Sequence, residues 1–268
     1  MRGAHTCGAL MALAEKNLAT FDLVVAASAG ACTAAYLVSR QFHLFSAVWT
    51  KYLHDGRFFD LKRLPTRRSV MDLDFLVHRV FRELDPLDLE AIRTSKTKFL
   101  IVSTACETGR VQYFDAHKDP ILNALKASAA MPIAYRHPVV IEGRTYIDGG
   151  VTDPIPVQKA VDEGCDEIVV LLTRPEGYRK KIPLVNVLSR LYARKFPRLA
   201  EALLKRYEAY NRSMDLIESG RLPARLTVIR PKAKLPVTRL TTSLPKIQAA
   251  IEQGQREALE ILSSKSLN

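Results

Sequence analysis

The segment "FDLVVAASAGACTAAYLVSR" constrains the fold more than any other part of the sequence. Its first half, Leu23–Ala27, is short and apolar, which is typical of a buried strand. Its second half is rich in alanine, which favours a helix. A strand that passes directly into a helix is the building unit of a parallel sheet. The sequence therefore predicts a strand at Leu23–Ala27, a helix from about Gly30 and an α/β fold.

The same succession of strands and helices continues along the chain. Apolar runs predict further strands at 98–106, 166–175 and 224–231. Helical spacing of apolar residues predicts helices at 8–17, 72–83, 120–129 and 156–163, a pair between 184 and 217 that is broken near Pro197, and a last helix at 243–263. We expect a core at 1–180 and a helical extension at 181–268 that completes the same domain and includes a strand near 224–230.

The composition indicates a globular, basic protein. Hydrophobic residues make up 47% of the chain, and 40 Lys and Arg against 28 Asp and Glu give a net charge of +12. Such an excess suits nucleic acid, an anionic membrane surface or an ordinary solvated surface. The chain has no recognisable helix-turn-helix, zinc or RNA-binding motif, and its charge is scattered, which argues against specific binding of nucleic acid.

Two basic stretches are candidates for contact with an anionic lipid surface. One is the helical region from 184 to 210, whose apolar positions alternate with arginines and lysines; packing of this stripe on the core is the other interpretation. The second is a cluster made of Lys62, Arg63, Arg67 and Arg68.

Targeting and metal-binding signals are absent from the sequence. No apolar run approaches the roughly 20 residues that cross a bilayer, and the N-terminus lacks the apolar core and cleavage site of a signal peptide. The four cysteines are scattered without a C-x-x-C pair, which argues against a zinc site or a disulfide framework. We expect a cytoplasmic protein that can also lie peripherally at the inner face of the membrane. We expect no metal site.

Ser28 stands at the junction of the predicted strand and helix, between Ala27 and Ala29. A serine on such a turn is the arrangement of a nucleophile elbow, which lifts the hydroxyl clear of the sheet. The helix behind it would direct N–H groups and a positive dipole end to a developing oxyanion. A structural N-cap is the alternative interpretation of the same residue.

A serine nucleophile needs a base, and Asp148 is the conspicuous candidate. None of the six histidines lies in a glycine-rich loop at a strand end. Asp148 follows an apolar strand end and is followed by Gly149 and Gly150, which let the backbone bring a carboxylate close to another group. An ordinary Asp-Gly turn is the alternative, and Asp153 is a lesser candidate acid.

Four blocks of sequence together resemble one known family. They are "MRGAHTCGAL", "AASAGA", "KASAAMPIAY" and "IDGG" followed by "PIPV", in that order. The chain resembles the patatin-like phospholipases, which are lipid acyl hydrolases with a Ser-Asp dyad. Two further stretches, "LLTRPEGYRKK" and the C-terminal "RPKAKLPVTRL" with "LPKIQAAIEQGQREAL", resemble a bacterial branch of that family with an extended C-terminal helical part. The resemblance implies a three-layer α/β/α sandwich with a mostly parallel central sheet. It also implies Ser28 as nucleophile and Asp148 as base, Arg2 and Gly3 as remnants of the oxyanion loop, and Ala26, Gly30, Gly149 and Gly150 as motif support.

The chain departs from the family pattern in two places. The strand and the first glycines of the motif G-G-G-x-R-G do not lie in this sequence, so that only Arg2 and Gly3 remain of the loop. An internal start within a longer reading frame and a naturally short protein are the two explanations. We expect impaired activity for this chain and recovery in an extended one. The second departure is Ala26, which stands where glycine is usual and fits if its φ is negative.

The resemblance implies hydrolysis of carboxylic ester bonds in lipids, of the phospholipase A or lysophospholipase type, through an acyl-enzyme and without a cofactor. Two alternatives stay open. One is a non-catalytic or impaired relative that binds lipid or anions, and the other is a soluble carboxylesterase or thioesterase. The expected partners are a lipid ester and an anionic membrane surface. The sequence does not fix the oligomeric state, the acyl chain or the headgroup.

Overall fold

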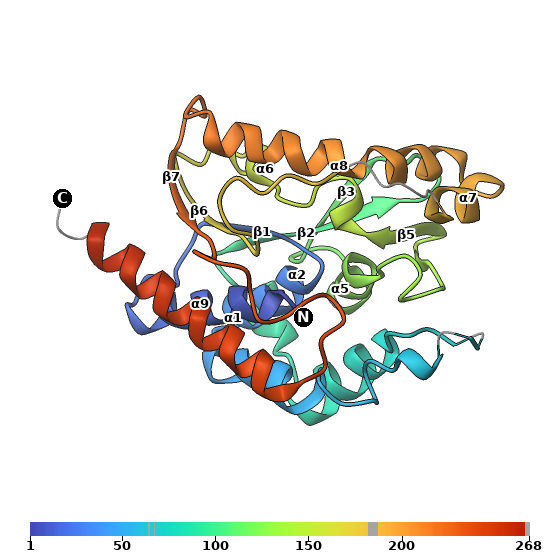
Figure 1. Cartoon of the computed structure of the whole chain (residues 1–268), viewed down its shortest axis with the longest axis horizontal. Coiled ribbons are helices and arrows are strands. Elements are labelled where there is room, and N and C mark those ends of the chain that lie inside the picture. The colour runs from blue at the N-terminus through green and yellow to red at the C-terminus, as the bar shows by residue number, and fades with distance from the viewer. Residues whose placement is uncertain (64, 67, 182–186, 266–268) are drawn as a thin grey trace.

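The chain folds into three layers. The computed structural model describes residues 1–268 except 64, 67, 182–186 and 266–268. Helices α6 (Val157–Asp162) and α8 (Pro197–Glu218) cover one face of the strands, as Figure 1 shows. The other face carries α1 (Gly3–Glu15), α2 (Ala29–Val38), α5 (Ile121–Ala129) and α9 (Leu244–Lys265). The predicted α/β class and its three layers are confirmed.

The strands form two sheets. The larger has the order β1-β2-β5-β4, with β3 paired to β2, and the smaller consists of β6 and β7. Their bounds are β1 (Leu23–Ala27), β2 (Lys98–Ala105), β3 (Val111–Asp115), β4 (Val139–Ile141), β5 (Arg144–Asp148), β6 (Glu167–Leu171) and β7 (Arg225–Ile229). The strand predicted at 23–27 is confirmed residue for residue, and those predicted at 98–106, 166–175 and 224–231 are confirmed with shorter bounds.

The larger sheet is mixed. Parallel pairing, as expected, joins β1 to β2 and β6 to β7. The pairs β2–β3, β2–β5 and β4–β5 are antiparallel, so antiparallel pairs accompany the parallel ones in the central sheet. For β4 and β5 the physical reason is the short connection: β4 turns into β5 through Glu142 and Gly143, both at positive φ, and a two-residue turn of this kind can join only antiparallel neighbours.

Strands β1 and β5 meet end to end on one edge of β2. Strand β3 pairs with Leu100 to Thr104 of β2 and so occupies the opposite edge along that whole length. On the first edge Ala27 is opposite Val102, and Asp148 is opposite Ser103, the next residue of β2. Because β1 is parallel to β2 and β5 is antiparallel to it, both strands end at this point. The residue after β1 and the last residue of β5 are therefore neighbours in space.

The division of the sheet leaves β1 with one partner. Within the described part of the chain β1 pairs only with β2, and β6 pairs only with β7. The free sides of β1 and β6 line the same cavity, which takes in all five residues of each strand. Strand β1, which leads to Ser28, is thus an edge strand within the described part of the chain, and its free side faces the cavity.

The helices follow the predicted pattern closely. Besides those already given, the structure has α3 (Phe45–Ala47), α4 (Leu89–Arg93), α7 (Val187–Ala193), the 3-10 turns Phe42–Leu44, Leu61–Arg63 and Gly149–Val151, and the π-helices η2 (Val48–Tyr52) and η4 (Phe75–Leu84). The predicted helix at 72–83 corresponds to η4, and the predicted pair after 184 corresponds to α7 and α8, with residues 184–186 outside the described part. Pro197 begins α8 rather than interrupting it, because proline is tolerated in a first turn.

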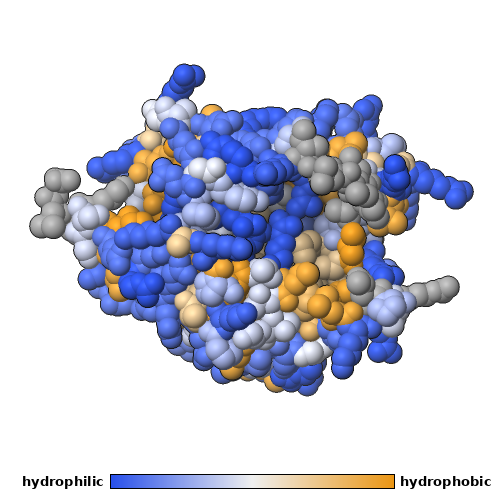
Figure 2. Space-filling view, in the orientation of Figure 1, coloured by the Kyte–Doolittle hydropathy of each residue, from blue (hydrophilic) through white to orange (hydrophobic). Residues whose placement is uncertain are grey.

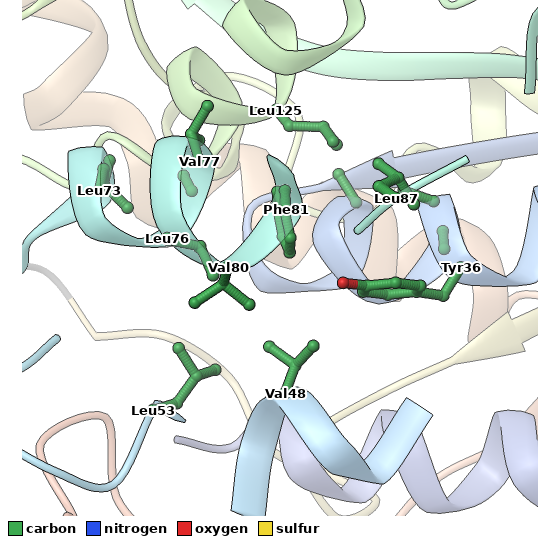
Figure 3. Close-up of a cluster of buried hydrophobic side chains, with 14 of the residues drawn as sticks. Tyr36, Val48, Leu53, Leu73, Leu76, Val77, Val80, Phe81, Leu87 and Leu125 are labelled. Carbon is green, nitrogen blue, oxygen red and sulfur yellow. The ribbon is translucent and has the colours of Figure 1, made fainter. Parts of the chain in front are cut away.

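The largest hydrophobic cluster of the described residues extends over α1, α2, α5, α9 and β2, and part of it lies between α2, η2 and η4. Figure 3 shows Val48 and Leu53 on one side of it and Val80 and Phe81 on the other. Tyr36 of α2 packs edge-to-face on Phe81, with ring centroids 5.8 Å apart, and its hydroxyl donates to the Asp85 carbonyl. This packing fixes the helix that follows Ser28.

Helices α1 and α9 cross in close contact, although they lie at opposite ends of the chain. A Cβ on Gly8 would lie 1.9 Å from the Ile251 carbonyl oxygen, so only glycine fits at this crossing. Buried His5 Nε2 also lies 2.9 Å from Glu257 Oε2. The C-terminal helix therefore fixes the helix that begins with Gly3. In the described part of the chain, no helix is both long enough and apolar enough to span a bilayer.

Candidate active site

Ser28 occupies a strained turn between β1 and α2. Its backbone has φ 57° and ψ −133°, a region that residues other than glycine rarely adopt. Ala26 is not among the residues at positive φ, so the condition for alanine at that position of the motif is met. A Cβ on Gly30 would meet no atom within 4 Å. The strain is therefore concentrated at the serine, as in a nucleophile elbow.

The Ser28 hydroxyl donates a hydrogen bond to Asp148. Its Oγ lies 2.7 Å from Asp148 Oδ2, and the other carboxylate oxygen, Oδ1, accepts from the Gly150 N–H at 2.7 Å. The Asp148 backbone is fixed as well, since its N–H donates to the Ala130 carbonyl and its own carbonyl accepts from Thr104 Oγ1. Each carboxylate oxygen thus has one donor, and the group faces the serine.

Gly149 allows this carboxylate to approach the sheet. A Cβ on Gly149 would lie 2.2 Å from the Val102 carbonyl oxygen, which is closer than any real side chain comes. Gly150 is confined from the other side, because a Cβ there would lie 2.8 Å from Asp148 Oδ1. The two glycines after the aspartate are therefore required by contact with β2 and with the carboxylate itself.

Burial governs the electrostatics of Asp148. The side chain is almost entirely removed from solvent, and this desolvation raises the pKa of its carboxyl above the ordinary 3.8. The hydrogen bonds from Ser28 and Gly150 and the positive charges of Arg239 and Arg206 act in the opposite direction on that pKa. A buried carboxylate with a raised pKa is a stronger base than an exposed one, as removal of a proton from a hydroxyl requires.

Two helices begin at the site. Ser28 and Ala29 start α2, and Arg2 and Gly3 start α1; a Cβ on Gly3 would lie 3.2 Å from the Ala29 Cβ, so the two helix starts are in contact. The first N–H groups of a helix have no partner within the helix. Backbone donors and two positive dipole ends are thus gathered beside Ser28, where an oxyanion would form.

Sequence reasoning missed Ala29 and Ser128 as parts of this arrangement. The N–H of Ala29 is a candidate donor because it follows the nucleophile, a position that the elbow geometry itself singles out. Ser128 Oγ accepts from the Ser28 N–H at 2.8 Å and donates to the Val102 carbonyl at 2.6 Å. Ser128 lies in "KASAAMPIAY", so the block was noticed while the role of its serine was not.

A cavity of about 480 Å³ adjoins the dyad. Both Ser28 and Asp148 line it, and so do Arg2, Gly3 and Gly150. Much of the remaining wall is apolar, and it includes Phe45, Trp49, Leu53, Phe58, Phe59 and Leu76. A volume of this order is that of a small-molecule pocket. Figure 2 shows one face of the molecule, largely hydrophilic above its centre, with hydrophobic residues gathered below and to the right.

Other predicted candidates lie elsewhere. The Asp153 carboxylate accepts from the Tyr113 hydroxyl at 2.7 Å, and Asp153 does not line the cavity. None of the six histidines lines it either. The described residues contain no cluster of three or more His, Cys, Asp or Glu side chains that could hold a metal ion, and all four cysteines are free.

The basic residues that were predicted to contact a lipid surface lie in different environments. On α8, Arg198 and Lys205 each lie within ion-pair distance of Glu201, whereas Arg206 lines the cavity. In the other cluster Arg63 pairs with Asp60 and Asp72. Arg67 lies outside the described residues.

Comparison with known proteins places the chain in context. A family model described as "Patatin-like phospholipase" matches residues 1–161, more than half of the chain, and a second, described as "Domain of unknown function (DUF6363)", matches residues 196–265. The uncharacterized protein YjjU of Escherichia coli (strain K12) is 31% identical over 177 residues, which cover 65% of this chain and 49% of YjjU. The chain thus spans about half the length of that curated relative.

A solved structure shares the fold. The crystal structure of VipD from Legionella pneumophila is similar with a TM-score of 0.52 and 14% sequence identity, over 98% of this chain and 65% of that one. At this identity the similarity concerns the fold alone.

Proposed function

The chain belongs to the patatin-like phospholipase family, and we propose that it is a serine acyl hydrolase that cleaves carboxylic ester bonds of lipids. The observation that carries the proposal is the 2.7 Å hydrogen bond from Ser28 Oγ, on its strained turn, to the buried Asp148 carboxylate. A nucleophile within hydrogen-bond reach of an oriented base is the recognisable feature of this chemistry.

The proposed first step forms an acyl-enzyme. Ser28 Oγ attacks the ester carbonyl carbon while its proton passes to Asp148. The carbonyl oxygen becomes an oxyanion, for which the N–H groups of Gly3 and Ala29 are the proposed donors, with Arg2 beside them. When the tetrahedral intermediate collapses, the C–O bond to the alcohol breaks and the leaving oxygen takes the proton from Asp148.

The proposed second step returns the enzyme to its starting state. A water molecule gives its proton to Asp148 and attacks the acyl carbon. The bond to Ser28 Oγ then breaks, Ser28 recovers the proton, and the carboxylic acid leaves. The apolar wall of the cavity, from Phe45 to Leu76, supports a fatty acyl chain as the group transferred, because contact with such a wall removes apolar surface from water.

The test is labelling by a fluorophosphonate, which reacts with activated serines. We expect labelling of the wild-type chain, none of Ser28→Ala, and strongly slowed labelling of Asp148→Asn. Asp153→Asn is the matched control, since this nearby aspartate bonds Tyr113 instead of the serine, and it should label like wild type. Equal labelling of wild type and Ser28→Ala would refute the proposal.

A second measurement separates a lipid hydrolase from a soluble carboxylesterase. Turnover of p-nitrophenyl esters from acetate to palmitate should rise with chain length and then level off as the cavity fills. Preference for the acetate would favour the soluble esterase over the lipid hydrolase.

A further inference from the structure

Five cationic side chains converge on the wall of the cavity near the dyad. They come from four separate places in the chain: the start of α1, the loop after β6, which supplies two of them, α8, and the segment between β7 and α9. They are Arg2, Arg174, Lys180, Arg206 and Arg239. The Met1 amino group donates to the Thr238 and Arg239 carbonyls, which holds Arg239 next to Arg2.

These cations lack the acidic partners that neighbouring cations have. None of the five forms an ion pair with another described residue. By contrast Arg179, adjacent to Lys180, pairs with both Asp215 and Glu218. The only acids on the described cavity wall are Asp148 and Glu167. Glu167 pairs with Arg225 and lies at the start of β6, the opposite end of that strand from Arg174. Positive charge therefore exceeds negative charge strongly at this end.

Holding these positive charges close together in a buried place is unfavourable. Burial lowers the pKa of Lys180 to about 7, and repulsion from Arg206, Arg239 and Arg2 contributes to the shift. Burial also lowers the pKa of Arg2 to about 10, with contributions from Arg239 and Arg174. Each lowered pKa means that the environment disfavours the charged form. A bound anion would reverse that balance.

Two aromatic rings contact two of these cations, Arg174 and Lys180. The Arg174 guanidinium lies 4.3 Å from the ring centre of Tyr178, and Lys180 Nζ lies 4.5 Å from that of Tyr210. The two rings pack edge-to-face, 5.8 Å apart. Arg174 Nε is buried and has no hydrogen-bond partner among the described atoms. A buried donor without an acceptor is costly, and it indicates that a ligand oxygen belongs nearby.

We propose that Arg2, Arg174, Lys180, Arg206 and Arg239 form a subsite for the phosphate group of a lipid ester with a net anionic headgroup, beside Ser28. The inference rests on the proposed function for the ester part of the ligand. Arginine and lysine are the residues that bind phosphate oxygens. Among its described residues the wall offers no free carboxylate for the ammonium group of a zwitterionic headgroup, because Asp148 is bonded to Ser28 and Gly150 and Glu167 is paired with Arg225. The subsite therefore selects an anionic phosphodiester over a zwitterionic one.

The experiment measures binding to Ser28→Ala, so that it does not depend on turnover. Trp49 is the only tryptophan of the chain and lines the cavity, and its fluorescence reports occupancy. Three ligands with the same acyl chains are compared: dihexanoyl phosphatidylglycerol (anionic), dihexanoyl phosphatidylcholine (zwitterionic) and dihexanoylglycerol (neutral). Inorganic phosphate is the fourth ligand. Arg206→Met and Lys180→Met are added to the Ser28→Ala background, with Arg212→Met, exposed on the same helix, and Lys181→Met as matched controls.

We expect phosphatidylglycerol to bind more tightly than the other two lipids. Arg206→Met and Lys180→Met should each weaken it about tenfold or more, since a hydrogen bond to a charged group is lost, and should leave dihexanoylglycerol within about twofold. The control variants should change nothing. Equal affinity for all three lipids, or parallel losses for the anionic and neutral lipids, would overturn the subsite.

Two further arms separate the remaining possibilities. Inorganic phosphate that binds as tightly as phosphatidylglycerol would overturn the lipid headgroup as the source of the anion. Circular dichroism checks folding, and Arg206→Lys should restore part of the affinity if charge, rather than packing, is what matters; absence of any rescue would count against the proposal. Selective anion binding without fluorophosphonate labelling of wild type would overturn the hydrolase and leave the subsite standing.

Discussion

The Ser28 hydroxyl meets the Asp148 carboxylate because their two strands end at consecutive residues of β2. Ala27 is opposite Val102 and Asp148 is opposite Ser103. The sequence separation of 120 positions between the two partners therefore has no bearing on the geometry, which is set by one strand that both neighbours share. This arrangement explains how a parallel strand and an antiparallel strand can present a serine hydroxyl and a carboxylate to each other.

Replacing Asp148 by asparagine should separate the charge of this residue from its shape. We expect ester turnover to fall by about 10²–10⁴-fold, the usual contribution of a general base. We also expect a higher melting temperature at pH 7, since the variant no longer buries a carboxylate whose pKa is raised by desolvation. Kinetics and thermal unfolding of wild type and Asp148→Asn test both parts. A variant as active as wild type would exclude Asp148 as the base.

The strained backbone of Ser28 predicts a difference between two inactive variants. Ser28→Ala keeps a Cβ at φ 57°, while Ser28→Gly removes it. Such a conformation costs about 1–3 kcal/mol for a residue other than glycine. Ser28→Gly should therefore be more stable than Ser28→Ala by about 1 kcal/mol or more in urea unfolding. As a control, Ala35→Gly, within α2, should lower stability; a less stable Ser28→Gly would mean that the turn stores no strain.

The glycines of the two motifs are predicted to differ in tolerance. In Gly149→Ala the new Cβ must displace the β2 backbone at Val102, so we expect a loss of about 1–3 kcal/mol in stability and a large loss of activity. Gly30→Ala has free space and replaces glycine in a helix, and it should be neutral or stabilising by up to about 1 kcal/mol. Chemical denaturation of both variants gives the comparison. Equal losses for the two substitutions would contradict the close contact at Gly149.

The acid side of the activity profile should report Asp148. Only the carboxylate can take the serine proton, and burial raises its pKa above 3.8, so kcat/KM should fall as the pH drops through a value above that of an ordinary aspartate. The free energy of unfolding should change with pH in the opposite direction. A carboxyl with a raised pKa in the folded state makes the fold less stable as the pH rises through that pKa. A kcat/KM profile measured from pH 4 to 8 tests this. An acid inflection at the ordinary aspartate value would show that burial does not tune the base.

The alkaline side of anion binding should report Lys180. Its pKa of about 7 means that it loses its charge as the pH rises through neutrality. Affinity for dihexanoyl phosphatidylglycerol, whose phosphodiester keeps its charge in this range, should therefore decline above about pH 7. Lys180→Met should bind weakly with no such inflection. An unchanged inflection in that variant would assign the titration to another group.

Local patterns in the sequence were sufficient to predict the strands that lead to Ser28 and Asp148. The apolar run before Ser28 predicted β1 with its observed bounds, and Asp148 lies at the end of a strand as expected. Strands β3 and β4 were missed, because short antiparallel strands of mixed exposure, with a polar residue such as Gln112, give no long apolar run. The prediction of the sheet was incomplete for the same reason.

The cationic cluster could not be predicted, because its members are far apart in the chain. Arg174 and Arg239 lie in two different loops and Arg206 lies in a helix, and only the tertiary fold brings them together. In the sequence Arg206 is indistinguishable from Lys205, its neighbour, which pairs with Glu201 at the surface. Which of two adjacent cations faces inward depends on how α8 packs, and that depends on the sheet beneath it.

The free side of β1 also bears on how the protein loses activity on warming. A strand with neighbours on both sides shares its backbone hydrogen bonds between them, but among the described strands β1 pairs with β2 alone. The position of Ser28 therefore depends on the packing of α1 and α2 around it, and α1 is held in turn by α9. Local opening of such an edge costs less free energy than global unfolding. Thermal inactivation should accordingly occur at a lower temperature than cooperative unfolding. Ser28 would move away from Asp148 while the interior stays folded.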